Sequence, residues 1–181
     1  MKRSLASNQS NVVASLRWAL VLAMLAFLLC ATTACKEHHP IPVLQGSEYR
    51  DLVEKYRGKV LLVNVWGTWC DPCLEEMPDL VAAAKQFKPE EVAVILIAAD
   101  SLEQREKAIP EFLKKVNATF PCYVQPPGDP QGLIDAIDKD WGGELPYTTV
   151  YDRQGRRIYG KAEQLDKAGF AKLMTNALNS K

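Results

Sequence analysis

The sequence predicts an α/β domain in which a central mixed β-sheet carries helices on both faces. Two short apolar runs rich in β-branched residues, 60–65 and 92–99, are typical of strands buried on both faces of a sheet. Segments with apolar residues every three or four positions follow them, and a hairpin pattern occupies 147–159. Parallel strands alternating with helices, then an antiparallel pair, predict this mixed sheet.

The first half of the chain supplies the central strand and the helix after it. A short helix is predicted over 47–56, just before strand 60–65. An amphipathic helix with apolar spacing over 74–84 follows, and strand 92–99 comes next. The following helix is either kinked at Pro110 or begins there, because proline lacks the N–H that a helix interior uses.

The second half is predicted to add three short strands and two helices. In chain order these are a strand over 120–125 closed by a turn at 126–129, a helix over 133–137, the hairpin strands 147–151 and 156–159, and a last helix after Asp166. Asp166 is a candidate N-cap, because its side chain can accept a hydrogen bond from the first turn.

Length and composition fit one domain with a single core. The chain has 181 residues, a formal net charge of 0 and 48% hydrophobic residues. The sequence has no internal repeat, no low-complexity tract and no basic patch of the kind that binds nucleic acid. We therefore expect no nucleic-acid partner.

The N-terminus has the pattern of an export signal. Residues 1–17 are polar and basic, and 18–31 form an uninterrupted apolar run, shorter than the roughly 20 residues of a membrane span. Thr32-Thr-Ala-Cys35 resembles a lipoprotein processing site, at which Cys35 would be acylated, although Thr32 stands where an aliphatic residue is usual. An uncleaved anchor and ordinary cleavage near Ala34 are the alternatives. All three outcomes place the domain outside the cytoplasm.

The expected organisation is therefore a leader, a tether and one domain. Residues 1–35 are the leader, lipoprotein signal or membrane anchor, 36–43 are a polar, proline-containing tether, and 44–181 are the folded domain. His38 and His39 fall in the tether, where we interpret them as tether residues and not as metal ligands.

Two cysteines lie where the central strand gives way to a helix. Cys70 and Cys73 are three residues apart, with Pro72 in the first helical turn. Unpaired N–H groups and the positive end of the helix dipole favour a thiolate on Cys70, the predicted nucleophile. Cys73 is one turn away, close enough for a reversible disulfide. A zinc site is disfavoured because it needs four ligands, and no second cysteine or histidine pair has a suitable spacing.

The segment Val63-Asn-Val-Trp-Gly-Thr-Trp-Cys-Asp-Pro-Cys-Leu-Glu-Glu-Met-Pro78 resembles the active-site block of the TlpA/ResA-like branch of the thioredoxin superfamily. The most specific features are Trp69-Cys-Asp-Pro-Cys73 and Glu76-Met-Pro78, and the order of elements agrees over about the whole chain after residue 43. The resemblance implies a thioredoxin fold and a thiol-disulfide oxidoreductase that works outside the cytoplasm, with its own disulfide as the redox group and no other cofactor or metal.

The resemblance also implies roles for residues around the cysteines. Pro146 matches a cis-proline whose neighbouring backbone, at Leu145, can pair with an extended substrate strand; the alternative is an ordinary turn proline. Glu76 matches an acid that relays a proton to or from Cys73; the alternative is a solvated carboxylate like Glu75. Asn64 stands where thioredoxin has a buried acid, and an amide cannot transfer that proton.

Residues that flank the sulfurs are predicted to contact substrate and to tune the couple. Trp69, Asp71, Pro72 and Leu145 are the expected substrate contacts, and Trp66 and Trp141 are candidates for an apolar rim beside Trp69. For Trp66 a place in the core is the equal alternative. The Asp71 carboxylate, with no cationic neighbour in the motif, should raise the pKa of Cys70 and make the couple more reducing. Cys122 is interpreted as a buried strand thiol.

The leading hypothesis is a membrane-tethered reductase of protein disulfides, with Cys70 as nucleophile and Cys73 as resolving cysteine. The resemblance implies clients such as apocytochrome c or copper-site proteins, and a membrane thiol carrier as electron donor. The alternative is a copper chaperone that uses the same two cysteines, although such relatives usually have a wider cysteine spacing and a distant histidine. A thiol peroxidase is disfavoured by the double-cysteine motif with Pro72.

Overall fold

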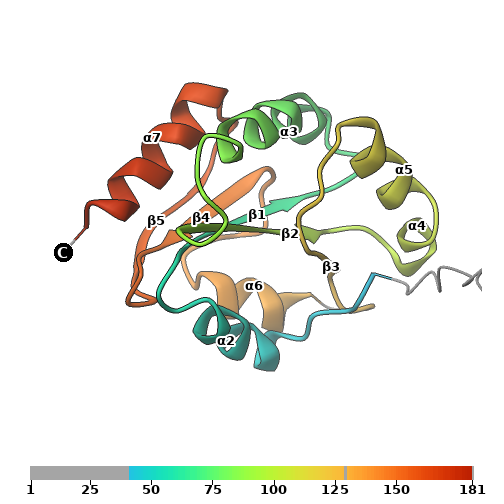
Figure 1. Cartoon of the computed structure of the whole chain (residues 1–181). Coiled ribbons are helices and arrows are strands. Elements are labelled where there is room, and N and C mark those ends of the chain that lie inside the picture. Colours follow the sequence, from blue (N-terminus) through green and yellow to red (C-terminus); the bar gives the residue numbers. More distant parts are fainter. Residues whose placement is uncertain (1–40, 129, 181) are drawn as a thin grey trace, which may run out of the picture. The chain divides into compact units, whose positions relative to one another are not determined.

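A computed structural model describes residues 41–128 and 130–180. Their core is a five-stranded sheet with the order β3-β2-β1-β4-β5 (Figure 1). The strands are β1 (Val60–Trp66), β2 (Val92–Ala98), β3 (Cys122–Val124), β4 (Tyr147–Tyr151) and β5 (Arg157–Ala162). β1, β2 and β3 run parallel, whereas β4 is antiparallel to both β1 and β5. The predicted mixed sheet is confirmed.

Helices cover both faces of this sheet. They are α2 (Gly46–Lys55), α3 (Asp71–Ala84), α4 (Leu102–Arg105), α5 (Ala108–Lys115), α6 (Gln131–Ile137) and α7 (Lys167–Leu178). In Figure 1, α3, α5 and α7 lie above the sheet, and α2 and α6 lie below it. Each face has its own buried apolar cluster.

Strand β1 lies at the centre of the sheet and is buried along its whole length. Leu62 and Trp66 belong to the cluster under α3, whereas Val63 and Val65 belong to the cluster on the α2 and α6 side. Because side chains alternate along a strand, Asn64 lies on the α3 face, between Leu62 and Trp66. The polar side chain is thus directed toward the helix that carries the cysteines.

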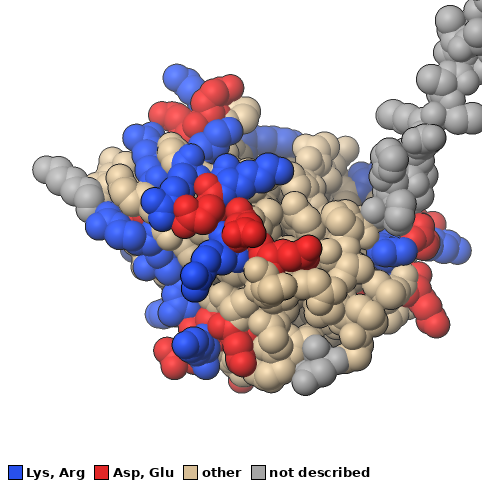
Figure 2. Space-filling view, turned by 90° about the horizontal axis from the view of Figure 1, so that it is seen from below, with Lys and Arg blue, Asp and Glu red and all other residues tan. Residues whose placement is uncertain are grey.

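The lower face carries charges of both signs. Figure 2 shows Lys and Arg side chains interspersed with Asp and Glu on this face, beside an area without charged side chains. The mixture differs from the single-signed basic surface that nucleic-acid binding requires.

Two details of the fold go beyond the sequence prediction. α5 begins at Ala108, so Pro110 lies in its first turn, where a missing N–H costs no helical hydrogen bond. Residues 41–43, which the sequence assigns to the tether, lie along the sheet edge: Val43 forms a bridge with Val124, and Val124 N donates to Pro42 O at 2.9 Å. Strand pairing extends to these residues because β3 has a free edge.

Residues 40–181 form one compact unit. The predicted leader, the lipidation site Cys35 and both histidines lie outside the described residues. Within 41–128 and 130–180, no helix combines the length and the apolar character that crossing a membrane requires.

Candidate active site

Cys70 and Cys73 form a disulfide at the N-terminus of α3, with 5.3 Å between their Cα atoms. A short loop after β1 leads directly to Cys70, which is the N-cap of the helix, and Pro72 occupies its first turn. Proline's fixed φ suits that position, and its missing N–H would be unpaired there in any case. The predicted strand-to-helix junction is confirmed.

The two sulfurs differ in accessibility and in their polar contacts. Cys70 is 5% exposed and Cys73 is wholly buried, so an incoming partner reaches Cys70 first. The backbone N–H of Cys73 donates a hydrogen bond of 3.3 Å to Cys70 Sγ. This donor and the positive end of α3 would stabilise a thiolate on Cys70 once the disulfide opens.

The loop before Cys70 is held by a buried carboxylate that the sequence analysis missed. Asp100 is 2% exposed and accepts hydrogen bonds from Thr68 N, at 3.0 Å, and from Thr68 Oγ1, at 2.5 Å. Trp69 Nε1 donates to Ala99 O in the same segment, at 3.2 Å. A usable signal exists in the sequence, because Asp100 directly follows β2, and parallel neighbouring strands end at the same edge.

Glu76 is a buried residue of α3, one turn after Cys73, and has two hydrogen-bond donors. It is 1% exposed; Asn64 Nδ2 donates to its Oε1 at 2.8 Å, and Leu165 N donates to its Oε2 at 2.9 Å. Burial raises the pKa of Glu76 to about 7, although these two hydrogen bonds act to lower it. Glu76 therefore exchanges its proton near neutral pH.

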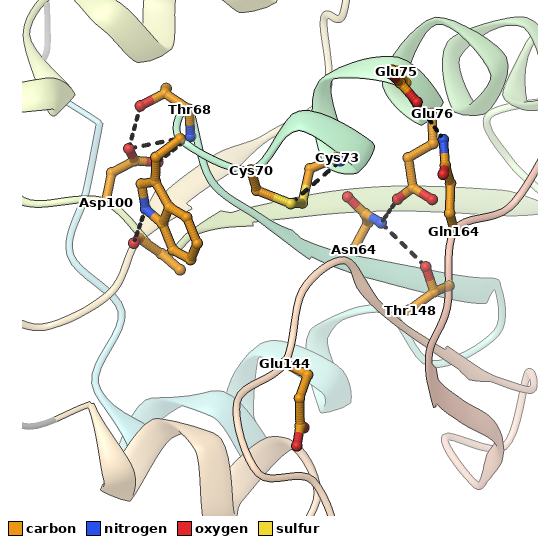
Figure 3. The surroundings of a disulfide bond; sticks show 12 residues. Asn64, Thr68, Cys70, Cys73, Glu75, Glu76, Asp100, Glu144, Thr148 and Gln164 are labelled. Carbon is orange, nitrogen blue, oxygen red and sulfur yellow. Dashed lines mark hydrogen bonds between the residues drawn. A yellow bond between two sulfur atoms is a disulfide. The ribbon is translucent and has the colours of Figure 1, made fainter.

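The neighbouring Glu75 lies in a different environment. Its side chain is exposed and accepts a hydrogen bond of 3.1 Å from Gln164 Nε2. Figure 3 shows the two carboxylates diverging from adjacent positions on α3, with Glu76 directed toward Asn64. The prediction that these two acids differ is thus supported in its geometry.

Trp69 and the loop before β4, which the sequence predicts as substrate contacts, line a common cavity. Leu145–Pro146 is a cis peptide bond, as predicted. Pro146 is buried and Leu145 is partly exposed, while Trp141 Nε1 donates to Glu144 O at 2.8 Å and so fixes the loop. Asp71 is exposed and Pro72 partly exposed beside Cys70.

An apolar cavity of about 150 Å³ opens beside this loop, with Trp69, Ile97, Trp141 and Leu145 among its lining residues. Two of its lining residues, Trp69 and Leu145, are next in sequence to Cys70 and Pro146. A larger cavity of about 410 Å³, lined in part by Phe87 and Phe120, includes none of the predicted site residues.

The three tryptophans considered for an apolar rim differ in burial, and Trp66 takes the core position that was its open alternative. Trp66 is wholly buried in β1 and packs on Phe112, with ring centroids 5.3 Å apart. Trp141 is 7% exposed and stacks on Tyr147 at 4.3 Å. Trp69, at 66% exposure, is the exposed member of the three, because it lies in the loop after β1 and not in the core.

Cys122 is a free, partly buried cysteine on β3. Burial raises the pKa of its thiol to about 12, which disfavours the thiolate that exchange requires. The register pairs Cys122 with Leu96 and Leu96 with Asn64, so Cys122 is two strands away from the strand under the disulfide. This placement agrees with a strand thiol.

No group of three or more His, Cys, Asp or Glu side chains is placed to hold a metal ion within 41–128 and 130–180. A copper chaperone would therefore have to use the two active-site sulfurs, with any third ligand coming from outside these residues.

Comparison with known proteins places this geometry in a family. The sequence profile of the AhpC/TSA family matches residues 43–158, which is more than half of the chain. The chain therefore belongs to the AhpC/TSA family. Within that match lie both cysteines, Glu76 and Pro146.

Curated relatives agree with the predicted ResA-like relationship. The thioredoxin-like protein YneN of Bacillus subtilis (strain 168) is 35% identical over 55% of this chain and 54% of its own length. Thiol-disulfide oxidoreductase ResA of Bacillus thuringiensis subsp. konkukian is 30% identical over 59% of this chain and 56% of its own length. The chain thus spans about half the length of these relatives.

A solved structure confirms the fold of this AhpC/TSA-family chain. The thioredoxin-family thiol:disulfide interchange protein from Chlorobium tepidum TLS superposes with a TM-score of 0.59 and 22% identity, over 79% of this chain and 99% of that one. The thioredoxin fold predicted from the active-site segment is therefore correct.

Proposed function

We propose that this protein is an extracytoplasmic, membrane-tethered thiol-disulfide oxidoreductase that reduces disulfides in client proteins. One observation carries the proposal: the Cys70–Cys73 disulfide lies at the N-terminus of α3, and one turn after Cys73 the same helix carries a buried acid, Glu76, whose pKa is about 7. A structural disulfide needs no such acid beside it. Relatives named as thiol-disulfide oxidoreductases support the same chemistry.

The cycle starts from the dithiol form. The Cys70 thiolate attacks one sulfur of a client disulfide, forming a mixed disulfide and releasing the other client sulfur as a thiolate that takes up a proton. Cys73 then loses its proton and attacks Cys70 Sγ, which releases the second client thiol and leaves the Cys70–Cys73 disulfide. The client gains two electrons and two protons, and the protein loses the same number.

Glu76 is the proposed acceptor of the Cys73 proton. It lies one helical turn from Cys73 on α3, and its pKa of about 7 lets it take a proton near neutral pH and release it afterwards. Glu75, which is exposed and directed elsewhere, has no such role.

Client binding is assigned to the surface beside Cys70. Trp69 offers an exposed indole, the cavity between Trp69 and Leu145 can accept an apolar client side chain, and the backbone at Leu145 and Pro146 can pair with an extended client strand. Asp71 and Pro72 complete this surface next to the nucleophile.

The leader sets the compartment in this proposal. An acylated Cys35 or an uncleaved leader would hold the domain at the outer side of the membrane, where a membrane thiol carrier re-reduces it. Candidate clients are apocytochrome c and copper-site proteins, as the family resemblance implies. Intact mass of the membrane fraction tests the lipid: a mature N-terminus other than acylated Cys35 contradicts it.

Trapping of clients tests the reductase activity. A Cys73→Ala variant of the full chain should accumulate mixed disulfides through Cys70, because the resolving thiol is missing, and mass spectrometry would name the bound clients. Cys70→Ala is the matched control and should trap nothing. If both variants gave the same adducts, or if neither gave any, the proposed mechanism would be wrong.

A further inference from the structure

Asn64 has a buried amide oxygen with no hydrogen-bond partner. The residue is wholly buried, and within the described part of the chain its Oδ1 makes no hydrogen bond. The nitrogen of the same amide is fully used: Nδ2 donates to Glu76 Oε1 at 2.8 Å and to Thr148 Oγ1 at 3.1 Å. An unpaired buried acceptor costs about 1–3 kcal/mol, so its place in the molecule needs a reason.

The orientation of this amide is shown by its two hydrogen bonds. Its nitrogen faces Glu76 Oε1 and Thr148 Oγ1, so its oxygen lies on the other side of the amide group. Figure 3 shows the oxygen of Asn64 on the side of the Cys70–Cys73 disulfide and the nitrogen on the side of Glu76 and Thr148.

The position on β1 explains why the oxygen lies there. Asn64 faces α3, on the same side of the strand as Leu62 and Trp66, and this face buries Cys70 and Cys73. Cys73 is wholly buried in the same cluster. In the disulfide form neither sulfur has a hydrogen to donate.

We propose that Asn64 is a positioning residue that accepts a hydrogen bond from the Cys73 thiol in the reduced protein, and thereby links Cys73 to Glu76. The step rests on the redox cycle proposed above. When a dithiol donor reduces the protein, the donor becomes a disulfide, the Cys70–Cys73 bond takes up two electrons and two protons, and the new Cys73 S–H faces Asn64 Oδ1. The buried acceptor gains its partner only in this state.

Two consequences follow for the couple. Asn64 stabilises the reduced form relative to the disulfide form, since S–H is a donor, although a weak one, and the disulfide is none. A hydrogen bond donated by the neutral thiol also keeps the proton on Cys73, so that Cys70 is the sulfur that ionises. An amide cannot carry the proton to Glu76, but it can hold both groups in place for the transfer.

The test is the redox equilibrium of Asn64→Leu against glutathione, with the full chain. Losing the acceptor should move the equilibrium about three- to tenfold toward the disulfide, which lowers the potential by about 14–30 mV. A purely structural role would destabilise both redox forms alike and leave this equilibrium unchanged, which would overturn the proposal.

Two comparisons isolate the contact with Cys73. Thr149→Val removes a different buried hydrogen bond, from Thr149 Oγ1 to Tyr159 O at 2.9 Å, and should leave the equilibrium unchanged. In a Glu76→Gln background, Asn64→Leu should still give the shift. If the shift disappears there, Asn64 acts through Glu76 alone and the proposal is wrong.

A second variant and an infrared measurement keep the proposal testable if leucine cannot be accommodated at position 64. Asn64→Ala leaves a void instead of a branched side chain and should move the equilibrium in the same direction. The infrared difference between Cys70→Ser and Cys70→Ser/Cys73→Ser isolates the S–H stretch of Cys73 with Asn64 intact. If the Cys73 S–H band has a lower wavenumber than in the unfolded protein, the hydrogen bond is supported. If the two wavenumbers are the same, the proposal is overturned. Wild-type protein that exchanges with no dithiol would instead refute the proposed function.

Discussion

Two carboxylates, Glu76 and Asp152, are equally buried in this domain but have partners of different charge. Each is 1% exposed. Glu76 accepts from an amide and a backbone N–H, and burial raises its pKa to about 7. Asp152 is also desolvated, yet hydrogen bonds from the backbone and guanidinium of Arg156 outweigh that effect and lower its pKa. In this pair of equally buried acids, the one beside a cation has the lowered pKa and the one without a cation has the raised pKa.

Asp138 follows the pattern of Asp152. It pairs with Arg157, which lowers its pKa to about 2, and it accepts a hydrogen bond of 2.5 Å from Tyr147 OH. The acids at this end of the β4–β5 hairpin are therefore structural anions. Glu76 differs from both, because its two hydrogen-bond donors, Asn64 Nδ2 and Leu165 N, carry no positive charge.

The largest expected effect is on stability at Asp152. Asp152→Ala removes the acceptor for Gln154 N at 2.9 Å, Arg156 N at 2.9 Å and Arg156 Nε at 2.6 Å, all within the β4–β5 turn. The free energy of unfolding should fall by about 4 kcal/mol, because the turn loses charge-assisted hydrogen bonds and its backbone donors lose their partner. Urea denaturation monitored by tryptophan fluorescence measures the change.

Asp166→Ala is the matched control for that variant. Asp166 caps α7 through a hydrogen bond of 2.7 Å from Gly169 N, and its loss should cost about 1 kcal/mol. The redox equilibrium should stay the same in both variants. If the two variants were equally destabilised, or if Asp152→Ala changed the redox equilibrium, the structural role of Asp152 would be contradicted.

The second prediction is that the two kinds of acid give opposite pH dependences of stability. The folded-state pKa of Glu76, about 7, lies above its unfolded value of 4.5, so the folded protein binds the extra proton and loses stability as pH rises from 4.5 to 7. This loss is about 3 kcal/mol. Asp138 and Asp152 have lowered pKa values, and their contribution is lost as pH falls below 3.8.

Unfolding curves of the oxidised protein between pH 3 and 8 test this prediction. Glu76→Gln should abolish the loss of stability between about pH 4.5 and 7. The separate loss of stability below pH 3.8, which belongs to Asp138 and Asp152, should remain. A wild-type stability that stays level between pH 4.5 and 7 would show that Glu76 titrates as an ordinary carboxylate.

The third prediction concerns the rate of thiol exchange. In the proposed mechanism an ionised Glu76 accepts the Cys73 proton, so the rate of the resolving step should rise with pH through about 7. Glu76→Gln should lower this rate about a hundredfold at pH 8 and abolish the rise of the rate near pH 7. Stopped-flow reduction of a model disulfide measures both.

Glu75→Gln provides the internal comparison on the same helix. Its exposed carboxylate should leave the profile unchanged. Equal effects of the two substitutions would refute the assignment of the proton relay to Glu76.

The sequence could predict those features that depend on local pattern. Apolar runs and spacing predicted the elements, and the cysteines with Pro72 predicted the strand-to-helix junction. The strand order and the cis peptide bond at Pro146 needed the family resemblance, because neither follows from periodicity.

The missed features depend on contacts between distant segments. Asp100 holds Thr68 from 32 residues away, and Leu165 N reaches Glu76 from 89 residues away. The burial of Trp141 depends likewise on tertiary packing, because the indole stacks on Tyr147 of β4. The amide of Asn64 was recognised as unable to transfer a proton, but its contact with Glu76 appears only when β1 and α3 are packed together.

The smallest expected effect belongs to a third kind of carboxylate, the exposed one at Asp71. It lies in the first turn of α3 beside Cys70, where it competes with the Cys70 thiolate for the positive end of the helix. Water screens this competition, so Asp71→Asn should move the equilibrium with glutathione only about twofold, toward the dithiol. The wild-type potential should then lie nearer the roughly −270 mV of thioredoxin than the roughly −120 mV of the strong oxidants. A shift above tenfold in Asp71→Asn would mean that solvent exposure does not weaken the effect of a carboxylate at this helix end. Burial would then no longer explain why Glu76 should affect the cysteines more strongly than the exposed Asp71 and Glu75.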